Sequence, residues 1–182
     1  SIMSKIAVID IGTNSVHMVL AEVLPDFTYK ILDRFKDMAR LGNGAFETQR
    51  LSDEAMARGL SVIGRLVTLA KNKGYERIIA VATSAVREAK NGGDFIDSVL
   101  EQTGLRVRVI SGSEEARLIF LAVKNNVPMT EQPSLAVDVG GGSVEVMAGN
   151  RDQLLHAKSL KLGAIRLADQ FLKRTPPSER ML

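Results

Sequence analysis

The sequence contains no cysteine and no tryptophan, only two histidines, and 4% aromatic residues in a chain of 182. Without cysteine the chain cannot form disulfides, thiolate zinc sites or a cysteine nucleophile. His17 and His156 are too few for a histidine-rich metal cluster. The chain also lacks the run of roughly 18 apolar residues that a membrane helix needs, and its first residues show no secretory signal pattern. We therefore expect a cytoplasmic protein that does not associate with membranes.

An excess of one charge is also missing, because 24 Lys and Arg stand against 21 Asp and Glu, a net charge of +3. The basic residues are scattered, and the densest short cluster is Lys71-Asn72-Lys73. The few aromatic residues do not alternate with basic ones, as they do on surfaces that stack nucleic-acid bases. A mixed, solvated surface without nucleic-acid binding is the expectation.

Hydrophobic periodicity predicts an α/β fold whose first part has the element order βββαβαβα. That order indicates an antiparallel meander followed by crossover units on one sheet. The predicted helix after Ser52 has the clearest pattern, with acidic residues in its first turn and Gly74 after its last. The strands are predicted over residues 6–10, 16–23, 28–35, 77–83 and 107–110, and the helices over 53–73, 84–89, 94–103 and, from a cap at Ser111 or Ser113, to about 125.

The start of the chain is repeated later in the sequence. VIDIGTNSVHMV, from Val8 to Val19, aligns with AVDVGGGSVEVM, from Ala136 to Met147, at a constant offset of 128 residues. An internal repeat of this kind predicts two similarly folded lobes. The matched positions are Asp10 with Asp138, Gly12 with Gly140, Ser15 with Ser143 and Val16 with Val144.

The repeat and a proline-containing stretch predict the domain organisation. We expect a first lobe over residues 1–126, a linker over 127–133, and the N-terminal part of a second lobe over 134–182. A strand near 154–162 and a helix over 163–172 continue the second copy, which then has βββα without the remaining βαβα. We therefore expect a fragment of a longer two-lobed protein, weakly active or inactive alone.

Each copy has a glycine loop after a strand that ends in aspartate. The first glycine loop is Gly12-Thr13-Asn14-Ser15, and the second is Gly140-Gly141-Gly142-Ser143. Small residues let backbone N–H groups approach an anion closely, so both loops are predicted to bind phosphate. A flexible β-turn is the alternative for either loop alone, and the repetition argues against it for the pair.

The aspartates that precede the loops, Asp10 and Asp138, would lie beside phosphate oxygens. Like charges repel, so an intervening cation is expected, and Mg²⁺ is the natural candidate. The alternative is turn capping, since aspartate readily bonds its own backbone two residues on. That alternative is stronger for Asp10 alone than for the repeated pair.

Two glutamates open the predicted helix after Ser111, where acidic residues by default complement the helix dipole. Glu114 has Arg117 three residues on, with which it could pair in solvent, and it is interpreted as structural. Glu115 instead shares its helix face with Leu118 and Ile119. It is therefore predicted to point along the buried stripe or into a cleft, where it could accept a proton from water.

Arg87 is predicted in the first turn of a short helix at the carboxyl end of a central strand, where α/β sheets usually bind ligands. Its guanidinium could bind a terminal phosphate by two parallel hydrogen bonds. A surface salt bridge is an equally weighted alternative. Glu145 alternates with Val144 and Val146 and is predicted to face away from them, whereas His17, its counterpart in the first copy, is interpreted as an ordinary strand residue.

The segments IDIGTNSVHMVL, ATSAVREA, ISGSEEARLIFLAV, VDVGGGSVEV and LKLGAIRLADQF together resemble the exopolyphosphatase and guanosine pentaphosphate phosphohydrolase (Ppx/GppA) family. The resemblance runs from about Lys5 to the end. It implies the actin-like ATPase (ribonuclease H-like) fold, with phosphate bound between two lobes. It also implies that Glu115 is the base that activates water, and that Arg87, Asp138, residues 140–143 and Glu145 belong to the site. Two small departures are Thr13, where many members have Ser, and Val144, where many have Thr.

The resemblance implies an enzyme that hydrolyses a terminal phosphoanhydride with Mg²⁺ and releases phosphate from inorganic polyphosphate. Guanosine pentaphosphate is the alternative substrate, and a homodimer of the full-length protein remains open. The alternative functions are a kinase of the same fold and a nucleotide-binding module without hydrolysis. Against both rivals stands the Ser-Gly-x-Glu-Glu-Ala motif at residues 111–116, which they generally lack.

Overall fold

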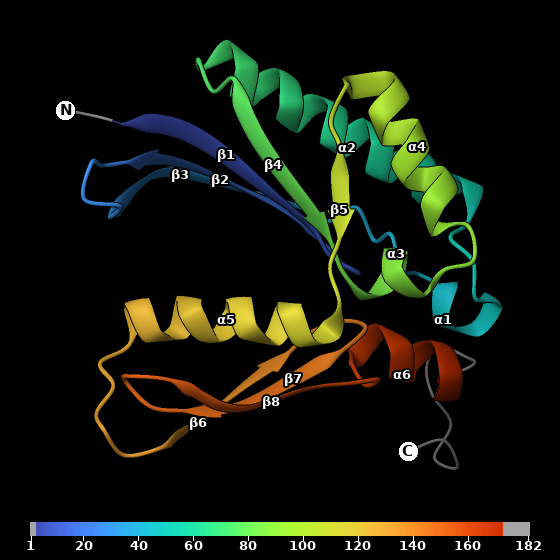
Figure 1. The fold of residues 1–182 in the computed structure, drawn as a ribbon. Coiled ribbons are helices and arrows are strands. Elements are labelled where there is room, and N and C mark those ends of the chain that lie inside the picture. Colours follow the sequence, from blue (N-terminus) through green and yellow to red (C-terminus); the bar gives the residue numbers. More distant parts are fainter. Residues whose placement is uncertain (1–2, 173–182) are drawn as a thin grey trace. The chain divides into compact units, whose positions relative to one another are not determined.

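The computed structural model describes residues 3–172, and contacts divide the chain into two compact units between Val109 and Ile110. Each unit is built on its own sheet (Figure 1). The first sheet has five strands in the order β3-β2-β1-β4-β5, and the second has three in the order β6-β7-β8.

The first sheet combines a meander with crossovers, as the sequence predicts. Antiparallel pairing joins β1 to β2 and β2 to β3, whereas β4 is parallel to β1 and β5 is parallel to β4. The connections to β4 and β5 therefore carry the helices. The strands are β1 (Ser4–Ile11), β2 (Val16–Val23), β3 (Tyr29–Asp37), β4 (Arg77–Ala82) and β5 (Val107–Val109).

Helices α2 (Asp53–Asn72) and α4 (Gly92–Thr103) cover one face of this sheet (Figure 1). Helix α2 begins where the Ser52 side chain accepts a hydrogen bond from the backbone N–H of Ala55. Two shorter helices, α1 (Ala45–Thr48) and α3 (Ser84–Glu88), complete the unit, and α1 is not predicted from the sequence. The core between sheet and helices is almost inaccessible to solvent and includes Ala7, Ile9, Ile11, Met18, Ile63, Phe95 and Val99.

In the second unit, helix α5 (Gly112–Asn126) packs on the three-stranded sheet, where Ala116 and Phe120 bury against Met147 (Figure 1). Both sheet pairings are antiparallel. The remaining elements are β6 (Ser134–Val139), β7 (Val144–Gly149), β8 (Leu154–Leu160) and α6 (Ala164–Phe171).

The division between the units differs from the predicted domain boundaries. The segment 127–133 does connect α5 to β6, but α5 itself groups with the second sheet and not with the first unit. Its buried side chains explain why, because Ala116 and Phe120 have their core partner on β7. The predicted range 134–182 extends into residues 173–182, which lie outside the described part of the chain.

Among residues 3–172, no helix is both long enough and apolar enough to cross a bilayer.

Candidate active site

The first glycine loop is the tip of the β1–β2 hairpin. Strand pairing ends with Ile11 opposite Val16, and the backbone N–H of Gly12 then donates to the carbonyl oxygen of Ser15 at 3.0 Å. A Cβ atom on Gly12 would lie 2.9 Å from that oxygen, closer than real side chains approach. The turn therefore requires glycine at position 12.

The second glycine loop repeats this geometry at the tip of the β6–β7 hairpin. Pairing ends with Val139 opposite Val144, and the N–H of Gly140 donates to the carbonyl oxygen of Ser143, again at 3.0 Å. A Cβ on Gly140 would lie 3.0 Å from the same oxygen. The sequence repeat is therefore a repeat of backbone conformation in the two units.

The carbonyl groups of the first glycine loop are bonded to the segment before α1. Gly42 N–H donates to Thr13 O at 2.8 Å, and Arg40 N–H donates to Asn14 O at 2.9 Å. Gly42 has no room for a side chain, because its Cβ would lie 2.3 Å from the Thr13 methyl group. Among the hydrogen bonds of the described residues, none uses the N–H groups of Asn14 or Ser15.

The carbonyl groups of the second loop are bonded to the start of α6 in the same way. Ile165 N–H donates to Gly141 O at 2.9 Å, and the Arg166 side chain donates through Nε to Gly142 O at 2.8 Å. Within residues 3–172 no hydrogen bond uses the N–H of Gly141, Gly142 or Ser143. Consecutive backbone N–H groups of this kind form a concave site for an anion.

Helix α3 is joined to the first glycine loop through two buried hydroxyl groups. Thr13 Oγ1 and Ser84 Oγ lie 2.8 Å apart, and Thr83 N–H donates to Ile11 O at 3.2 Å. Arg87 is the fourth of five residues in α3, in its last turn and not in the predicted first turn. Arg87 is half-buried and takes part in a further interaction, and its helix directly follows Thr83, which contacts the strand before the loop.

Glu115 lies in the first turn of α5, which begins where the Ser111 hydroxyl accepts a hydrogen bond from the N–H of Glu114. The sequence predicts that Glu115 points along the buried stripe or into a cleft, and Ile119, on the same predicted face, packs against the core of the second unit. Helix α5 buries Ala116 and Phe120 against its own sheet, whereas Leu118, three residues after Glu115, is 37% exposed. Glu115 is half-buried at the edge of the packed stripe.

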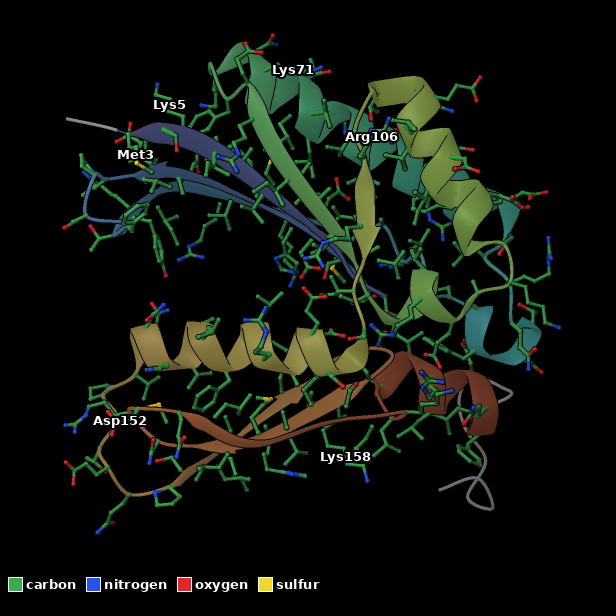
Figure 2. All side chains as sticks on the ribbon, viewed as in Figure 1. Met3, Lys5, Lys71, Arg106, Asp152 and Lys158 are labelled. Atoms are coloured by element: carbon green, nitrogen blue, oxygen red, sulfur yellow. The ribbon has the colours of Figure 1, made fainter. Side chains whose placement is uncertain are left out.

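Helix α5 runs parallel to β7, and this direction sets the position of Glu115 within the second unit. Phe120 lies against Gly149, at the end of β7. The segment after α5 is bonded to the β7–β8 turn, since Arg151 N–H donates to Thr130 O at 2.9 Å. Asp152 lies in this turn (Figure 2). The other end of α5, with Glu115, therefore lies at the end of the sheet that carries the second glycine loop (Figure 1).

Glu145 is 1% exposed and lies on the sheet face that α5 covers, because it alternates with Val144 and shares its face with buried Met147. The Ser159 hydroxyl donates to Glu145 Oε1 at 2.7 Å. The predicted orientation away from Val144 and Val146 agrees with this burial pattern. Burying a carboxylate is costly, which suits a residue kept for function.

Asp10 and Asp138 are both exposed, and each lies two residues before the glycine of its loop. In the described part of the chain, no group of three or more His, Cys, Asp or Glu side chains could hold a metal ion by itself. One carboxylate beside each glycine loop nevertheless fits Mg²⁺, which is commonly bound by one or two carboxylates, waters and substrate phosphates.

Four contact residues are missing from the sequence predictions: Arg40, Gly42, Gly163 and Arg166. Their signal in the sequence is weak, because single glycines and arginines occur in many loops. Two sequence features could have indicated Gly42 and Gly163: Gly42 is followed two residues later by Gly44, and Gly163 directly precedes a predicted helix.

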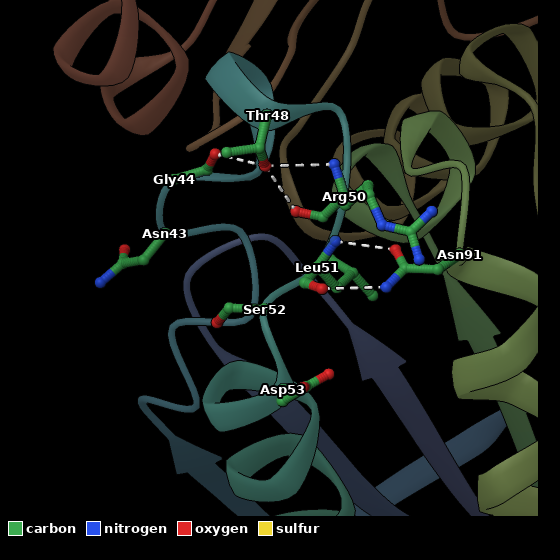
Figure 3. A pocket seen from close by; sticks show the side chains of 8 residues that line it. All are labelled: Asn43, Gly44, Thr48, Arg50, Leu51, Ser52, Asp53 and Asn91. Carbon is green, nitrogen blue, oxygen red and sulfur yellow. Dashed lines mark hydrogen bonds between the residues drawn. The ribbon is translucent and has the colours of Figure 1, made fainter.

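The first unit also has a cavity of about 330 Å³ at the start of α2 (Figure 3). Asn91 closes one side, accepting from Leu51 N–H at 2.8 Å and donating to Leu51 O at 2.9 Å. Its polar groups are thus used to join the starts of α2 and α4. The cavity contains none of the predicted site residues; its lining is Asn43, Gly44, Thr48, Arg50, Leu51, Ser52, Asp53 and Asn91.

Comparisons with known proteins show which family and which solved structures the chain is similar to. The model of the Ppx/GppA phosphatase family matches residues 19–182. Exopolyphosphatase 1 of Mycobacterium leprae (strain TN) is 32% identical over 176 residues, which cover 97% of this chain and 52% of that protein. The chain thus spans about half the length of the curated relatives it matches.

Solved structures give the same result. The crystal structure of an exopolyphosphatase from Cytophaga hutchinsonii has a TM-score of 0.91 at 36% identity, covering 97% of this chain and 56% of that one. The Aquifex aeolicus member of the Ppx/GppA family has a TM-score of 0.76 at 34% identity, covering 98% and 57%. These matches confirm the predicted actin-like ATPase fold. The chain belongs to the Ppx/GppA phosphatase family.

Proposed function

We propose that the protein hydrolyses the terminal phosphoanhydride bond of inorganic polyphosphate and releases phosphate. The observation that carries this proposal is the second glycine loop, at the end of the unit that also carries Glu115. The N–H groups of Gly141, Gly142 and Ser143 in this loop have no acceptor among the described residues. The names of the relatives, which include exopolyphosphatases, support the same reaction.

The glycine loops would bind phosphoryl oxygens through backbone N–H groups. Dipoles whose orientation is fixed before the substrate arrives stabilise charge that develops in the transition state without reorganising. The loops fit this requirement because their carbonyl oxygens are bonded to neighbouring segments in each unit. In phosphoryl transfer, such positioning and electrostatic stabilisation supply most of the rate enhancement.

Glu115 would act as the general base. Its carboxylate accepts a proton from water as the water oxygen bonds to the terminal phosphorus. The bond from that phosphorus to the bridging oxygen breaks, and the shortened polyphosphate leaves with the electron pair on that oxygen. A general base typically raises the rate about 10²- to 10⁴-fold, so the rest of the rate enhancement must come from the groups that bind the phosphate.

Arg87 and Glu145 have supporting roles in this proposal. The permanent charge of the Arg87 guanidinium would offset the charge of the phosphate. Glu145, fixed by Ser159, places a carboxylate beside the second loop. Asp138 and Asp10 would hold Mg²⁺, which when bound would neutralise phosphate charge and orient the phosphoryl group.

The experiment measures phosphate release by the complete protein on polyphosphate, guanosine pentaphosphate and ATP side by side. The proposal expects polyphosphate to have the highest kcat/KM, whereas faster turnover of the pentaphosphate would make the nucleotide the substrate. Glu115→Gln should lower kcat by about 10² or more with little change in substrate affinity. Glu114→Gln, the neighbouring change in the same helical turn, is the matched control and should retain activity. Equal activity of the two variants would contradict the role of Glu115.

A further inference from the structure

Each peptide group of the second glycine loop has its carbonyl bonded to the first turn of α6. The Gly140–Gly141 peptide accepts from Ala164 N–H at 3.2 Å. The Gly141–Gly142 peptide accepts from the N–H groups of Ile165 and Arg166 at 2.9 and 3.0 Å. In a trans peptide the N–H points opposite to the C=O. The N–H groups of these peptides are therefore turned away from α6.

The third peptide, Gly142–Ser143, is held by a side chain instead of the backbone. Arg166 Nε donates to Gly142 O at 2.8 Å, and Arg166 is 7% exposed. A charged donor forms a stronger hydrogen bond than a neutral one, and a buried guanidinium is costly unless it is bonded. This contact turns the Ser143 N–H away from α6, in line with its two neighbours.

The close approach of α6 to the loop depends on Gly163. Its φ is +129°, and a Cβ there would lie 2.5 Å from Gly141 O. Any side chain at this position would force the helix away from the loop. The contact with α6 is therefore built into the sequence at two places, Gly163 and Arg166.

The first unit shows the same arrangement made with different atoms. The repeat pairs Thr13 with Gly141 and Asn14 with Gly142. In the first unit the corresponding carbonyl oxygens accept from the backbone N–H groups of Gly42 and Arg40. A backbone N–H donates to Asn14 O, and the Arg166 side chain donates to the equivalent oxygen, Gly142 O. The segment before α1 and the start of α6 are not part of the repeat, yet each holds the equivalent peptides of its own loop by their carbonyl oxygens.

We propose that Arg166 is a positioning residue that fixes the Gly142–Ser143 peptide so that the Ser143 N–H faces the phosphoryl group. Arg166 acts through the peptide and does not contact the substrate. The inference rests on the proposed function for its kinetic consequence, but the orientation of the peptide is independent of activity. Without the guanidinium, that peptide can rotate and the loop loses one of its aligned donors.

The test compares Arg166→Met with Arg151→Met in the complete protein. Arg151 lies in the β7–β8 turn, where it pairs with exposed Glu131, and serves as the matched control. The order parameter of the Ser143 amide, measured by NMR relaxation, is the readout that needs no activity. The proposal expects it to fall below about 0.6 in Arg166→Met, because the peptide can then rotate, and to stay unchanged in Arg151→Met.

Kinetics supply the second readout. Arg166→Met should raise KM for polyphosphate by about 10-fold or more, and Arg166→Lys, which can still donate to a carbonyl, should recover part of the loss. An unchanged Ser143 order parameter in a folded Arg166→Met would overturn the proposal, whatever the substrate proves to be. If Arg166→Met does not fold, Arg166→Lys decides, and a wild-type order parameter and KM in that variant would overturn the need for a guanidinium. A lowered order parameter in a protein without polyphosphatase activity would keep the positioning role and reject the function.

Discussion

Thr13 and Ser84 bring their hydroxyl oxygens to 2.8 Å from each other in the interior of the first unit. This hydrogen bond connects the first glycine loop to α3, the helix that carries Arg87. Both residues are at most 5% exposed, so neither hydroxyl can turn to water if its partner is removed.

Removing one hydroxyl of this pair should destabilise the protein more than removing both. Ser84→Ala or Thr13→Val alone leaves a buried hydroxyl unpaired and should cost about 1–3 kcal/mol in the free energy of unfolding. The double variant should cost no more than either single change, because no hydroxyl is then left unpaired. Urea denaturation measures all three, with exposed Ser61→Ala as the control. Additive effects would mean that the two hydroxyls are not coupled.

Ser159 should stabilise the protein through Glu145. Its hydroxyl donates to the Glu145 carboxylate at 2.7 Å, and that carboxylate is 1% exposed. Ser159→Ala should lower the free energy of unfolding by about 1–3 kcal/mol. Ser159→Thr keeps the hydroxyl and should retain most of the wild-type stability. Chemical denaturation tests this, with Ser134→Ala, at an exposed position, as the matched change. An equal loss in the Ala and Thr variants would assign the effect to packing instead.

Strand β6 should make the 182-residue chain self-associate. It is an edge strand, and Leu135, Val137 and Val139 are 70%, 54% and 71% exposed. Their counterparts in the repeat, Ala7, Ile9 and Ile11, are at most 1% exposed beneath helices. Exposed apolar edge strands favour association, and lysine on them opposes it.

Val137→Lys should therefore lower the self-association measured by sedimentation velocity over a concentration series. Val127→Lys, at a valine 52% exposed but outside the strand, is the matched control. An equal reduction in both variants would show that net charge, and not the strand, governs association.

How much the sequence predicts depends on the range of the contact. The glycine loops could be predicted because their turn is local: Gly12 and Gly140 bond residues three positions away, and the residue types that allow this are visible in the sequence. The element order could be predicted for the same reason, since it rests on periodicity and on local capping signals such as Ser52. Only the short helix α1 has no such signal.

Contacts between distant segments could not be predicted. Arg166 and Gly142 are 24 residues apart, and nothing in a lone arginine specifies a carbonyl partner. The face of Glu115 was predicted from the apolar residues of α5, but both faces of that helix carry apolar side chains. Which face is buried depends on the three-stranded sheet. The unit to which α5 belongs depends on that sheet for the same reason.

Tyr75 should make stability fall at alkaline pH. Burial raises the pKa of the Tyr75 phenol, and the negative charges of Glu22 and Asp33 raise it further. Because the folded pKa lies above the unfolded value of about 10, the folded state binds the proton more tightly, and this stability is lost as the pH rises above about 10. Tyr75→Phe should remove that part of the pH dependence of unfolding.

Direct titration checks the same point. The chain has two tyrosines, so Tyr29→Phe leaves Tyr75 as the only phenol. Ultraviolet absorbance of this variant should give a midpoint above about 10, and a midpoint at or below that value would contradict the effect of burial.

The central claim is that the backbone N–H groups of both glycine loops bind phosphoryl oxygens. The most direct measurement is an NMR titration of the Glu115→Gln variant with polyphosphate, following the amides of Asn14, Ser15, Gly141, Gly142 and Ser143. The account predicts that the amides of each loop shift as polyphosphate is added, while those of the β7–β8 turn do not. Unshifted loop amides under conditions in which the wild-type protein releases phosphate from polyphosphate would contradict it.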